Sequence, residues 1–396
     1  MKTEAYKGVL SDYAFYVKEH IAVSSLDRDH YFSTENMIPN RGGVCRATSL
    51  PEQERAIRVE AGDVLISNIR PYFKKIWLAK ELAGCSNDVL CIRAKSMCLP
   101  EFLFYYLSSD TFFDYVMAGA KGTKMPRGDK QQIMHFHVLI PNLDIQKQVI
   151  SILSCIDEKI QLNAQINRNL EQQAQAIFKS WFVDFEPFRD GKFVDSELGP
   201  IPEGWRIVPL DEIADFLNGL PMQKYRPATD RLGLPVLKIK ELREQFCSAD
   251  SERCLEDIKQ EYVVEDGDVV FSWSGSLLID IWTGGRCGLN QHLFKVTSTQ
   301  HEKWFYYLWT CHHLANFIAI AADKATTMGH IQRGHIHAAL TLVPSKQEYE
   351  ELSAILSPII DKMIHSRLES RRLSTLRDTL LPKLMSGEID VSEVEV

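Results

Sequence analysis

The sequence predicts an α+β fold made of two similar globular domains, each followed by a long helix. Three observations support this prediction: a length of 396 residues, an internal repeat with an offset near 203 residues, and two long stretches with apolar residues at helical spacing. A chain of this length exceeds what one hydrophobic core usually organises. Hydrophobic residues at 45% and charged residues at 25% are typical of a globular chain.

The internal repeat is visible as short matching segments that occur in the same order in both halves of the chain. The segment VEAGDV at 59–64 recurs as VEDGDV at 264–269, and FYYL at 104–107 recurs at 305–308. Farther along, the offset settles at 203. An ordered series of this kind favours two copies of one unit over two unrelated domains, and its period is too long for a solenoid.

Four segments follow from the repeat. We expect a first domain at 1–143, a long helix and its exit at 144–189, a second domain at 190–345, and a final long helix and tail at 346–396. Inside each domain we expect a turn followed by a buried strand, an aromatic-rich amphipathic helix, and a closing strand that ends at a proline.

Both long helices carry a heptad pattern of apolar residues that becomes polar at its centre. The polar positions are Asn163 and Asn167 in the first helix and, 203 residues later, Ser366 and Ser370 in the second. Two copies related by a two-fold axis would pair these helices antiparallel. We therefore expect Asn163 to lie near Ser370 and Asn167 near Ser366. Pro358 is expected to kink or interrupt the second helix near its start.

No catalytic constellation is recognisable in the sequence. The glycine-rich phosphate loops, the G-x-S-x-G elbow, the H-E-x-x-H motif and the motifs of a DNA methyltransferase are absent. The histidines at 330, 335 and 337 have no acidic or cysteine company, so no metal site is predicted. Asp63 and Asp268 follow glycines at strand starts, where a role in the turn is favoured over catalysis. Nine cysteines without a C-x-x-C pair indicate reduced thiols.

The net charge of −8 argues, taken alone, against a nucleic-acid partner. The charge is unevenly spread, however. Residues 1–145 hold 18 basic and 17 acidic side chains, net +1, whereas residues 191–345 hold 15 and 20, net −5. No apolar run reaches the length of a membrane span and the first residues do not resemble a signal peptide, so we expect a cytoplasmic protein.

Two loops of the first copy have the composition of DNA-contacting segments. In the first copy, RPYFKK at 70–75 and KGTKMPRGDK at 121–130 combine cations, aromatic rings and glycine, which suits contacts with phosphates and base edges. The equivalent segments at 272–276 and 324–333 keep the position but change the side chains. A solvated basic loop is the alternative for either stretch. The candidate DNA-binding residues are Arg70, Tyr72, Lys74, Lys75, Lys121, Thr123, Lys124, Arg127, Trp273, Ser274, Thr326, Thr327, His330 and Arg333.

Several segments together resemble the specificity subunits of type I restriction–modification systems. They are GPIPEGW at 199–205, IFKSWFVDFEP at 177–187, LNQHLF at 289–294 and LRDTLLPKLMSGEI at 376–389. The resemblance covers the whole chain except for a poorly matched stretch of about 20 residues at its start. It is specific because the motifs occur in combination.

The resemblance implies a DNA-recognition subunit with two target-recognition domains, each reading one half of a split double-stranded site. It implies two antiparallel helices that set the spacing and dock two methyltransferase subunits, with restriction subunits as further partners. S-adenosylmethionine, ATP and Mg²⁺ are expected on those partners and no cofactor on this chain. Trp181, Phe182 and Phe185 are candidates either for docking or for packing on the neighbouring domain.

Two alternatives stay open at this stage. One is a coiled-coil scaffold without a role on DNA, which the basic loops disfavour. The other is a single-chain DNA methyltransferase, which the missing methyl-donor and catalytic motifs disfavour.

Overall fold

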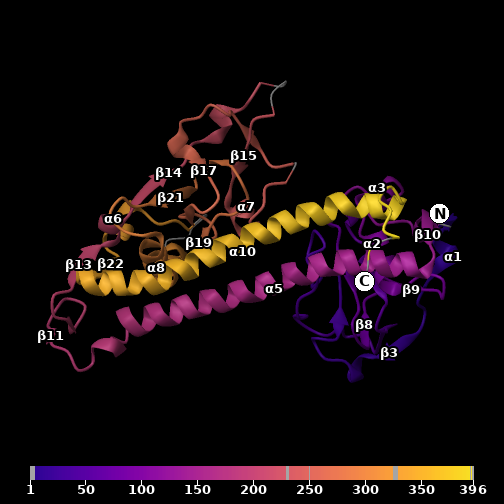
Figure 1. Ribbon diagram of the computed structural model, residues 1–396, viewed down its shortest axis with the longest axis horizontal. Helices are drawn as coiled ribbons and strands as arrows, with labels where there is room; N and C mark the ends of the chain where they lie inside the picture. The colour runs from indigo at the N-terminus through magenta and orange to yellow at the C-terminus, as the bar shows by residue number, and fades with distance from the viewer. Residues whose placement is uncertain (1–4, 229–231, 249, 324–328, 393, 395–396) are drawn as a thin grey trace. The chain divides into compact units, whose positions relative to one another are not determined.

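The computed structural model describes residues 5–228, 232–248, 250–323, 329–392 and 394 (Figure 1). Two compact units make up the chain, one of residues 1–159 with 373–396 and the other of residues 160–372. The boundaries between the units fall inside the long helices α5 (Leu143–Phe182) and α10 (Lys346–Ser386). They differ from the domain boundaries expected at 143, 189 and 345, because each helix contributes its two ends to different cores.

The described residues in the globular part of the first unit form two four-stranded sheets and one strand pair. The first sheet has the order β2 (Ala14–Tyr16), β9 (Val89–Ala94), β6 (Val64–Ser67) and β7 (Ile76–Leu78). The second has the order β3 (His20–Ala22), β5 (Arg55–Val59), β8 (Ala83–Cys85) and β4 (Tyr31–Phe32). The pair consists of β1 (Ala5–Val9) and β10 (His137–Pro141). The short helices are η1 (Val23–Ser25), η2 (Pro71–Phe73), α1 (Leu10–Tyr13), α2 (Pro100–Leu107), α3 (Asp110–Ala118) and α4 (Lys130–Met134).

The globular part of the second unit is built from corresponding pieces. One sheet has the order β14 (Asp215–Asn218), β21 (Leu293–Thr297), β18 (Val269–Ser272) and β19 (Leu278–Ile281). The other has the order β16 (Arg253–Cys254), β15 (Leu234–Leu237), β20 (Cys287–Leu289) and β17 (Val263–Val264). The strand pairs are β13 (Arg206–Pro209) with β22 (Leu340–Val343), and β11 (Phe193–Val194) with β12 (Ile201–Pro202). The helices are η3 (Glu186–Phe188), η4 (Met222–Tyr225), η5 (Gln260–Tyr262), α6 (Leu210–Ile213), α7 (Ile239–Glu244), α8 (Lys303–Asp323) and α9 (Arg333–His337).

The repeat found in the sequence is a repeat of the fold. The order β2-β9-β6-β7 corresponds strand by strand to β14-β21-β18-β19. In the other sheet, β8 and β20 each run parallel to one strand and antiparallel to another. One difference between the copies is that α8 is continuous where the first unit has α2 and α3 with a break between them. The α+β prediction is confirmed.

The aspartates that follow the repeated glycines hold the turns before β6 and β18. Asp63 accepts a hydrogen bond from the backbone N–H of Glu60 and pairs with Arg93 at 2.7 Å. Asp268 likewise accepts a hydrogen bond from the backbone N–H of Glu265 at 2.8 Å and pairs with Lys295. The glycines before them have φ of +91° and +95°, which only glycine adopts at little cost. These carboxylates therefore stabilise equivalent turns.

In the second unit, residues 160–182 of α5 and 346–372 of α10 run antiparallel. Asn163 donates from Nδ2 to the backbone carbonyl of Ser366 at 3.5 Å and to Glu369 at 2.8 Å. The expected pairing of Asn163 with Ser370 and of Asn167 with Ser366 is therefore wrong by one helical turn. The reason is local, since the hydroxyl of Ser370 donates to the carbonyl of Ser366 in its own helix at 3.0 Å and needs no partner across the pair.

The helix α10 continues through Pro358 without the interruption considered from the sequence. In the first unit, residues 143–159 of α5 pack beside the end of α10, where Arg377 pairs with Asp157 at 2.8 Å. The hydroxyl of Tyr105 donates to the same carboxylate at 3.0 Å. Within the described part of the chain, no helix combines the length and the apolarity needed to cross a membrane.

Candidate nucleic-acid interface

The two loops predicted in the first unit lie side by side and form one surface. The backbone N–H of Arg70, in the loop at 70–75, donates to the carbonyl of Pro126, in the loop at 121–130, at 2.8 Å. Arg127 forms an antiparallel bridge with the residue just before Arg70. Two segments about 50 residues apart in the sequence are thus joined through their backbones.

A turn that sequence reasoning missed adds a third segment to this surface. The N–H of Asn40 donates to the carbonyl of Phe73 at 2.8 Å, and the N–H of Arg41 donates to that of Lys74 at 3.0 Å. Asn40, Arg41, Arg70 and Lys74 all have φ between +51° and +61°. Among the described residues, only two other non-glycine residues have a positive φ. Strained backbone is therefore concentrated here, as is common at functional sites. The composition of the turn, Asn-Arg-Gly-Gly, was the available signal.

Most of the cations predicted to meet DNA have partners within the unit. The pairs are Lys74 with Asp110 at 2.8 Å, Lys75 with the carbonyl of Thr34 at 2.6 Å, Lys121 with Asp129 at 2.8 Å, and Arg127 with Asp88 at 3.3 Å. Burial lowers the pKa of Lys75, which lies 5.8 Å from the ring centre of Phe73. A loop of freely solvated cations is not what the structure contains, because several of these charges hold the loops in place.

A subset of the candidates stays accessible to a ligand. Thr123 and Lys124 are exposed, Tyr72 is 46% exposed, and the side chains of Lys121 and Arg127 are 82% and 54% exposed. Ion pairs at such exposed positions are weak because water screens them, so a phosphate can replace the carboxylate partner. Arg70 is half-buried, and its Nε is buried without a hydrogen-bond partner among the residues that the structure describes.

The second unit presents its two loops in the same relationship. Ser274 forms an antiparallel bridge with His330, which is the position equivalent to Arg127. The N–H of Gly275 donates to the carbonyl of Gly329 at 3.0 Å, and the N–H of Ile331 to that of Trp273 at 3.0 Å. The backbone frame is therefore repeated while the side chains differ.

Trp273 is the centre of the second surface. Its Nε1 donates to Oδ1 of Asn218 at 3.0 Å and to the carbonyl of Gln291 at 3.2 Å. The ring centres of His292 and His330 lie 6.1 and 6.3 Å from that of Trp273. The hydroxyl of Ser274 and Nδ1 of His292 are 2.9 Å apart. Sequence reasoning did not propose Asn218 or His292 as site residues, because they come from strand β14 and from the turn before β21, both distant from Trp273 in the sequence.

The remaining candidates of the second loop are less well defined. Arg333 is exposed and its guanidinium approaches the carbonyl of Phe216 at 3.5 Å. Thr326 and Thr327 lie outside the described residues. Of the histidines weighed as metal ligands, His337 pairs with Asp211 at 3.0 Å. Among the described residues, no group of three or more histidine, cysteine or acidic side chains could hold a metal ion.

The aromatic residues at the exit of α5 are chiefly packing residues. Phe182 is 3% exposed and its ring centre lies 5.4 Å from that of Trp205 and 5.3 Å from that of Trp309. Trp181 and Phe185 are half-buried, and Phe185 lies 5.9 Å from Trp205. Docking of a partner on Phe182 is therefore excluded, because its ring is part of the core.

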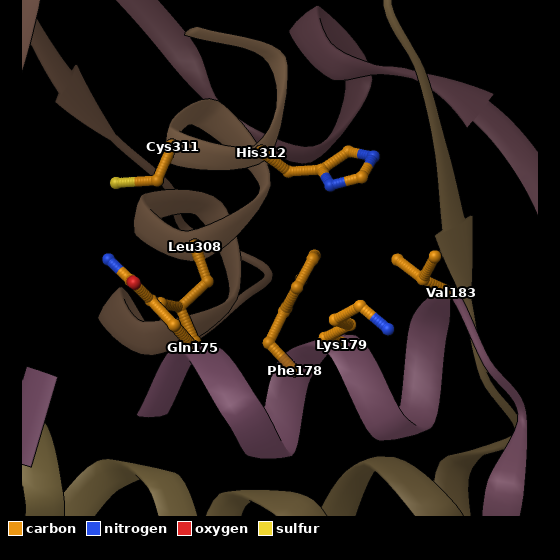
Figure 2. Close-up of a pocket in the computed structure, with 7 residues that line it drawn as sticks. All are labelled: Gln175, Phe178, Lys179, Val183, Leu308, Cys311 and His312. Carbon is orange, nitrogen blue, oxygen red and sulfur yellow. The ribbon is translucent and has the colours of Figure 1, made fainter. Parts of the chain in front are cut away.

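A cavity of about 360 Å³ opens between α5 and α8 (Figure 2). It is lined by Gln175, Phe178, Lys179, Val183, Leu308, Cys311 and His312. Burial raises the pKa of Cys311 to about 12, which keeps the thiol protonated and poorly nucleophilic. The lining shares no residue with either loop surface and contains no catalytic pair.

Comparison with known proteins relates the chain to specificity subunits of type I restriction enzymes. The family model described as type I restriction modification DNA specificity domain matches residues 44–172. The chain is 24% identical over 352 residues to the MjaIX specificity subunit of Methanocaldococcus jannaschii, covering 86% of this chain and 81% of that one. It is 22% identical over 431 residues to the HindI specificity subunit of Haemophilus influenzae, covering 91% and 94%.

A solved structure supports the fold. The S subunit of a type I restriction–modification system from M. genitalium superposes with a TM-score of 0.54 at 13% identity, covering 97% of this chain and 96% of that one. The family match, the relatives aligned along most of the chain and the duplicated fold agree with one another. In sequence along most of its length, and in its fold, the chain is therefore similar to the specificity subunits of type I restriction–modification systems.

Proposed function

We propose that this chain recognises a bipartite sequence in double-stranded DNA, with the first unit reading one half and the second unit the other. The single observation that supports this most strongly is the repeated pairing of two loops, Ile69 with Arg127 in one unit and Ser274 with His330 in the other. The same backbone frame carries different side chains, as two readers of different sequences require. Phosphate contacts position such a surface and contacts with base edges supply its specificity.

The two surfaces offer different chemistry to DNA. The first offers Lys121, Lys124 and Arg127, which suit phosphates and the acceptor edge of guanine. The second offers the indole of Trp273 and the imidazole of His330, which suit stacking and hydrogen bonds with little net charge. We therefore expect the first unit to supply more of the salt-dependent affinity.

The chain is the non-catalytic subunit, and the reactions belong to its partners. We propose that it assembles with two methyltransferase subunits and with restriction subunits, and that S-adenosylmethionine, ATP and Mg²⁺ bind to those partners. Helices α5 and α10 have 40 and 41 residues, roughly 60 Å each at about 1.5 Å per residue. We propose that they set the spacing between the half-sites and dock the methyltransferases.

The decisive experiment is co-expression of the chain with the methyltransferase subunit of its own system, followed by sequencing of methylated positions in the host DNA. We expect methylation at one split motif, and none when either subunit is omitted. Methylation by this chain alone would indicate the single-chain methyltransferase. Assembly without any sequence-dependent methylation or DNA binding would favour the scaffold without a role on DNA.

A further inference from the structure

The first residue of α3, Asp110, pairs with two cationic side chains that come from two different loops. The guanidinium of Arg41 donates to Oδ1 of Asp110, and Nζ of Lys74 lies 2.8 Å from the same oxygen. Arg41 also donates from Nε to the carbonyl of Ser108 at 2.5 Å. The turn at 38–43 and the loop at 70–75 are therefore both tied to the start of one helix.

Both cations are side chains of residues whose backbone conformation must be held by the surrounding structure. Arg41 and Lys74 have φ of +61° and +51°, a region that side-chain-bearing residues adopt only when the surroundings hold them there. Their side chains are only 15% and 28% exposed, whereas that of Asp110 is 64% exposed. Burial would raise the pKa of Asp110, but the hydrogen bonds and charges of Lys74 and Arg41 outweigh it, so the pKa is lowered. The carboxylate is ionised and available to both cations at neutral pH.

The break between α2 and α3 makes this arrangement possible. Ser109 caps α3, its hydroxyl accepting from the N–H of Phe112 at 3.3 Å, and Asp110 follows at the start of the helix against η2. An acidic residue there also interacts favourably with the positive end of the helix dipole, and this is its simplest role. The second unit has the continuous helix α8 in this place, and the repeat offsets of 201 to 203 lead from Asp110 to Cys311, His312 and His313, none of which is acidic. The carboxylate is thus particular to the first unit.

We propose that Asp110 is a positioning residue for DNA recognition, holding the turn at 38–43 and the loop at 70–75 in the conformation that reads the first half-site. This inference rests on the proposed function. Asp110 would not contact a base. It would repel DNA if it acted alone, and its contribution is to fix Arg41 and Lys74 relative to each other and to the adjoining loop at 121–130.

The test compares the wild-type chain with Asp110→Asn, which keeps the shape of the side chain and removes its charge. Each chain is purified with its methyltransferase, and the dissociation constant for DNA is measured over a series of salt concentrations. Three duplexes are used: the motif identified by sequencing methylated positions, the same motif scrambled in its first half, and the same motif scrambled in its second half. We expect Asp110→Asn to lose discrimination in the first half by roughly tenfold, the effect of one misplaced base contact.

Other readouts separate positioning from general loss of structure. Discrimination in the second half should stay at the wild-type value. Non-specific binding should be unchanged or tighter, with a salt slope steeper by about 0.9 for each phosphate that a released cation contacts. Asp114→Asn is the matched control, because Asp114 is exposed on the next turn of α3 and has no ion pair among the described residues. It should leave all three affinities unchanged.

Two further variants keep the test decisive. Asp110→Glu restores the charge and should recover part of the lost discrimination. Lys74→Met removes one partner and should reproduce the loss in the first half even if Asp110→Asn folds poorly. Wild-type discrimination in Asp110→Asn, or an equal loss in both halves, would overturn the inference while leaving the proposed function intact. A wild-type complex with no preference for either half would overturn the proposed function itself.

Discussion

The carboxamide of Asn163 and the backbone carbonyl of Ser366 are 3.5 Å apart, and the two residues are separated by 203 positions, the offset of the internal repeat. The hydroxyl of Ser366 donates in return to the carbonyl of Asn163, also at 3.5 Å. Equivalent residues of the two copies therefore meet each other within the second unit. Both are buried, at 1% and 3% exposure, so the contact pairs polar groups that would otherwise be unsatisfied.

Replacing Asn163 with alanine should lower the unfolding free energy of the second unit by about 1–2 kcal/mol, because Glu369 and the neighbouring carbonyl lose a buried donor. Urea unfolding followed by tryptophan fluorescence measures this, since six of the seven tryptophans lie within 160–372 and only Trp77 lies outside. Asn167→Ala is the control, because within the described part of the chain Oδ1 of Asn167 has no hydrogen-bond partner. A larger loss in Asn167→Ala than in Asn163→Ala would support the pairing expected from the sequence instead.

Lys124→Ala and Arg127→Ala should weaken DNA binding in different ways. Lys124 is exposed, and its loss should reduce affinity by a similar factor on all sequences and lower the salt slope by about 0.9 if it neutralises one phosphate. Arg127 is anchored by Asp88 and by the bridge between the loops, so its loss should also cost about 1–3 kcal/mol of preference for the first half-site. Filter binding or fluorescence anisotropy across a salt series separates the two effects. Equal affinity of Arg127→Ala and wild type for the motif would show that this loop is not a reader.

Trp273→Phe should alter recognition of the second half-site alone. Phenylalanine keeps a ring beside His292 and His330 but removes the indole N–H that ties the loop to Asn218 and Gln291. We expect relaxed preference at one or two positions of the second half, seen by sequencing of methylated sites. Ser276→Ala, an exposed change in the same loop, is the control and should preserve the motif. A change confined to the first half would contradict the assignment of the units.

Acidification should destabilise the second unit through His313. Burial, assisted by the nearby His312, lowers the pKa of His313 from 6.5 to about 4, while Nε2 lies 2.9 Å from the carbonyl of Leu340. Between these values the unfolded chain binds a proton that the folded chain does not. Stability is therefore fully present above about pH 6.5 and falls as the pH drops towards about 4.

His313→Gln, which keeps an N–H donor but does not titrate, is the variant that tests this. Its unfolding free energy should depend less on pH between about 6.5 and 4 than that of the wild type. His20→Gln, an exposed change in the first unit, is the matched control. Parallel pH profiles for wild type and His313→Gln would exclude this histidine as the source.

The candidate site was partly predictable because loop position follows from the repeat. The segments at 70–75 and 121–130 could be selected by composition, and the structure joins them through Arg70 and Pro126. The sequence could not show which of their cationic side chains are free to contact DNA. Asp88, Asp110 and Asp129 pair with these cations, and the partners of Lys74 and Arg127 are more than 30 residues away in the sequence. The turn containing Arg41 was missed for the same reason, because its contact with Lys74 exists only in the folded unit.

The sequence by itself determined the duplicated α+β organisation, the two long helices and the resemblance to type I specificity subunits, because all three depend on periodicity and on motifs that are local along the chain. Only the tertiary structure decided which polar residues meet between the helices, which cations are already paired, and that Phe182 belongs to the core. Helical periodicity allows registers one turn apart with almost the same apolar seam, and packing selects between them. Exposure and pairing of a charge depend on residues brought from elsewhere in the chain, which composition does not reveal.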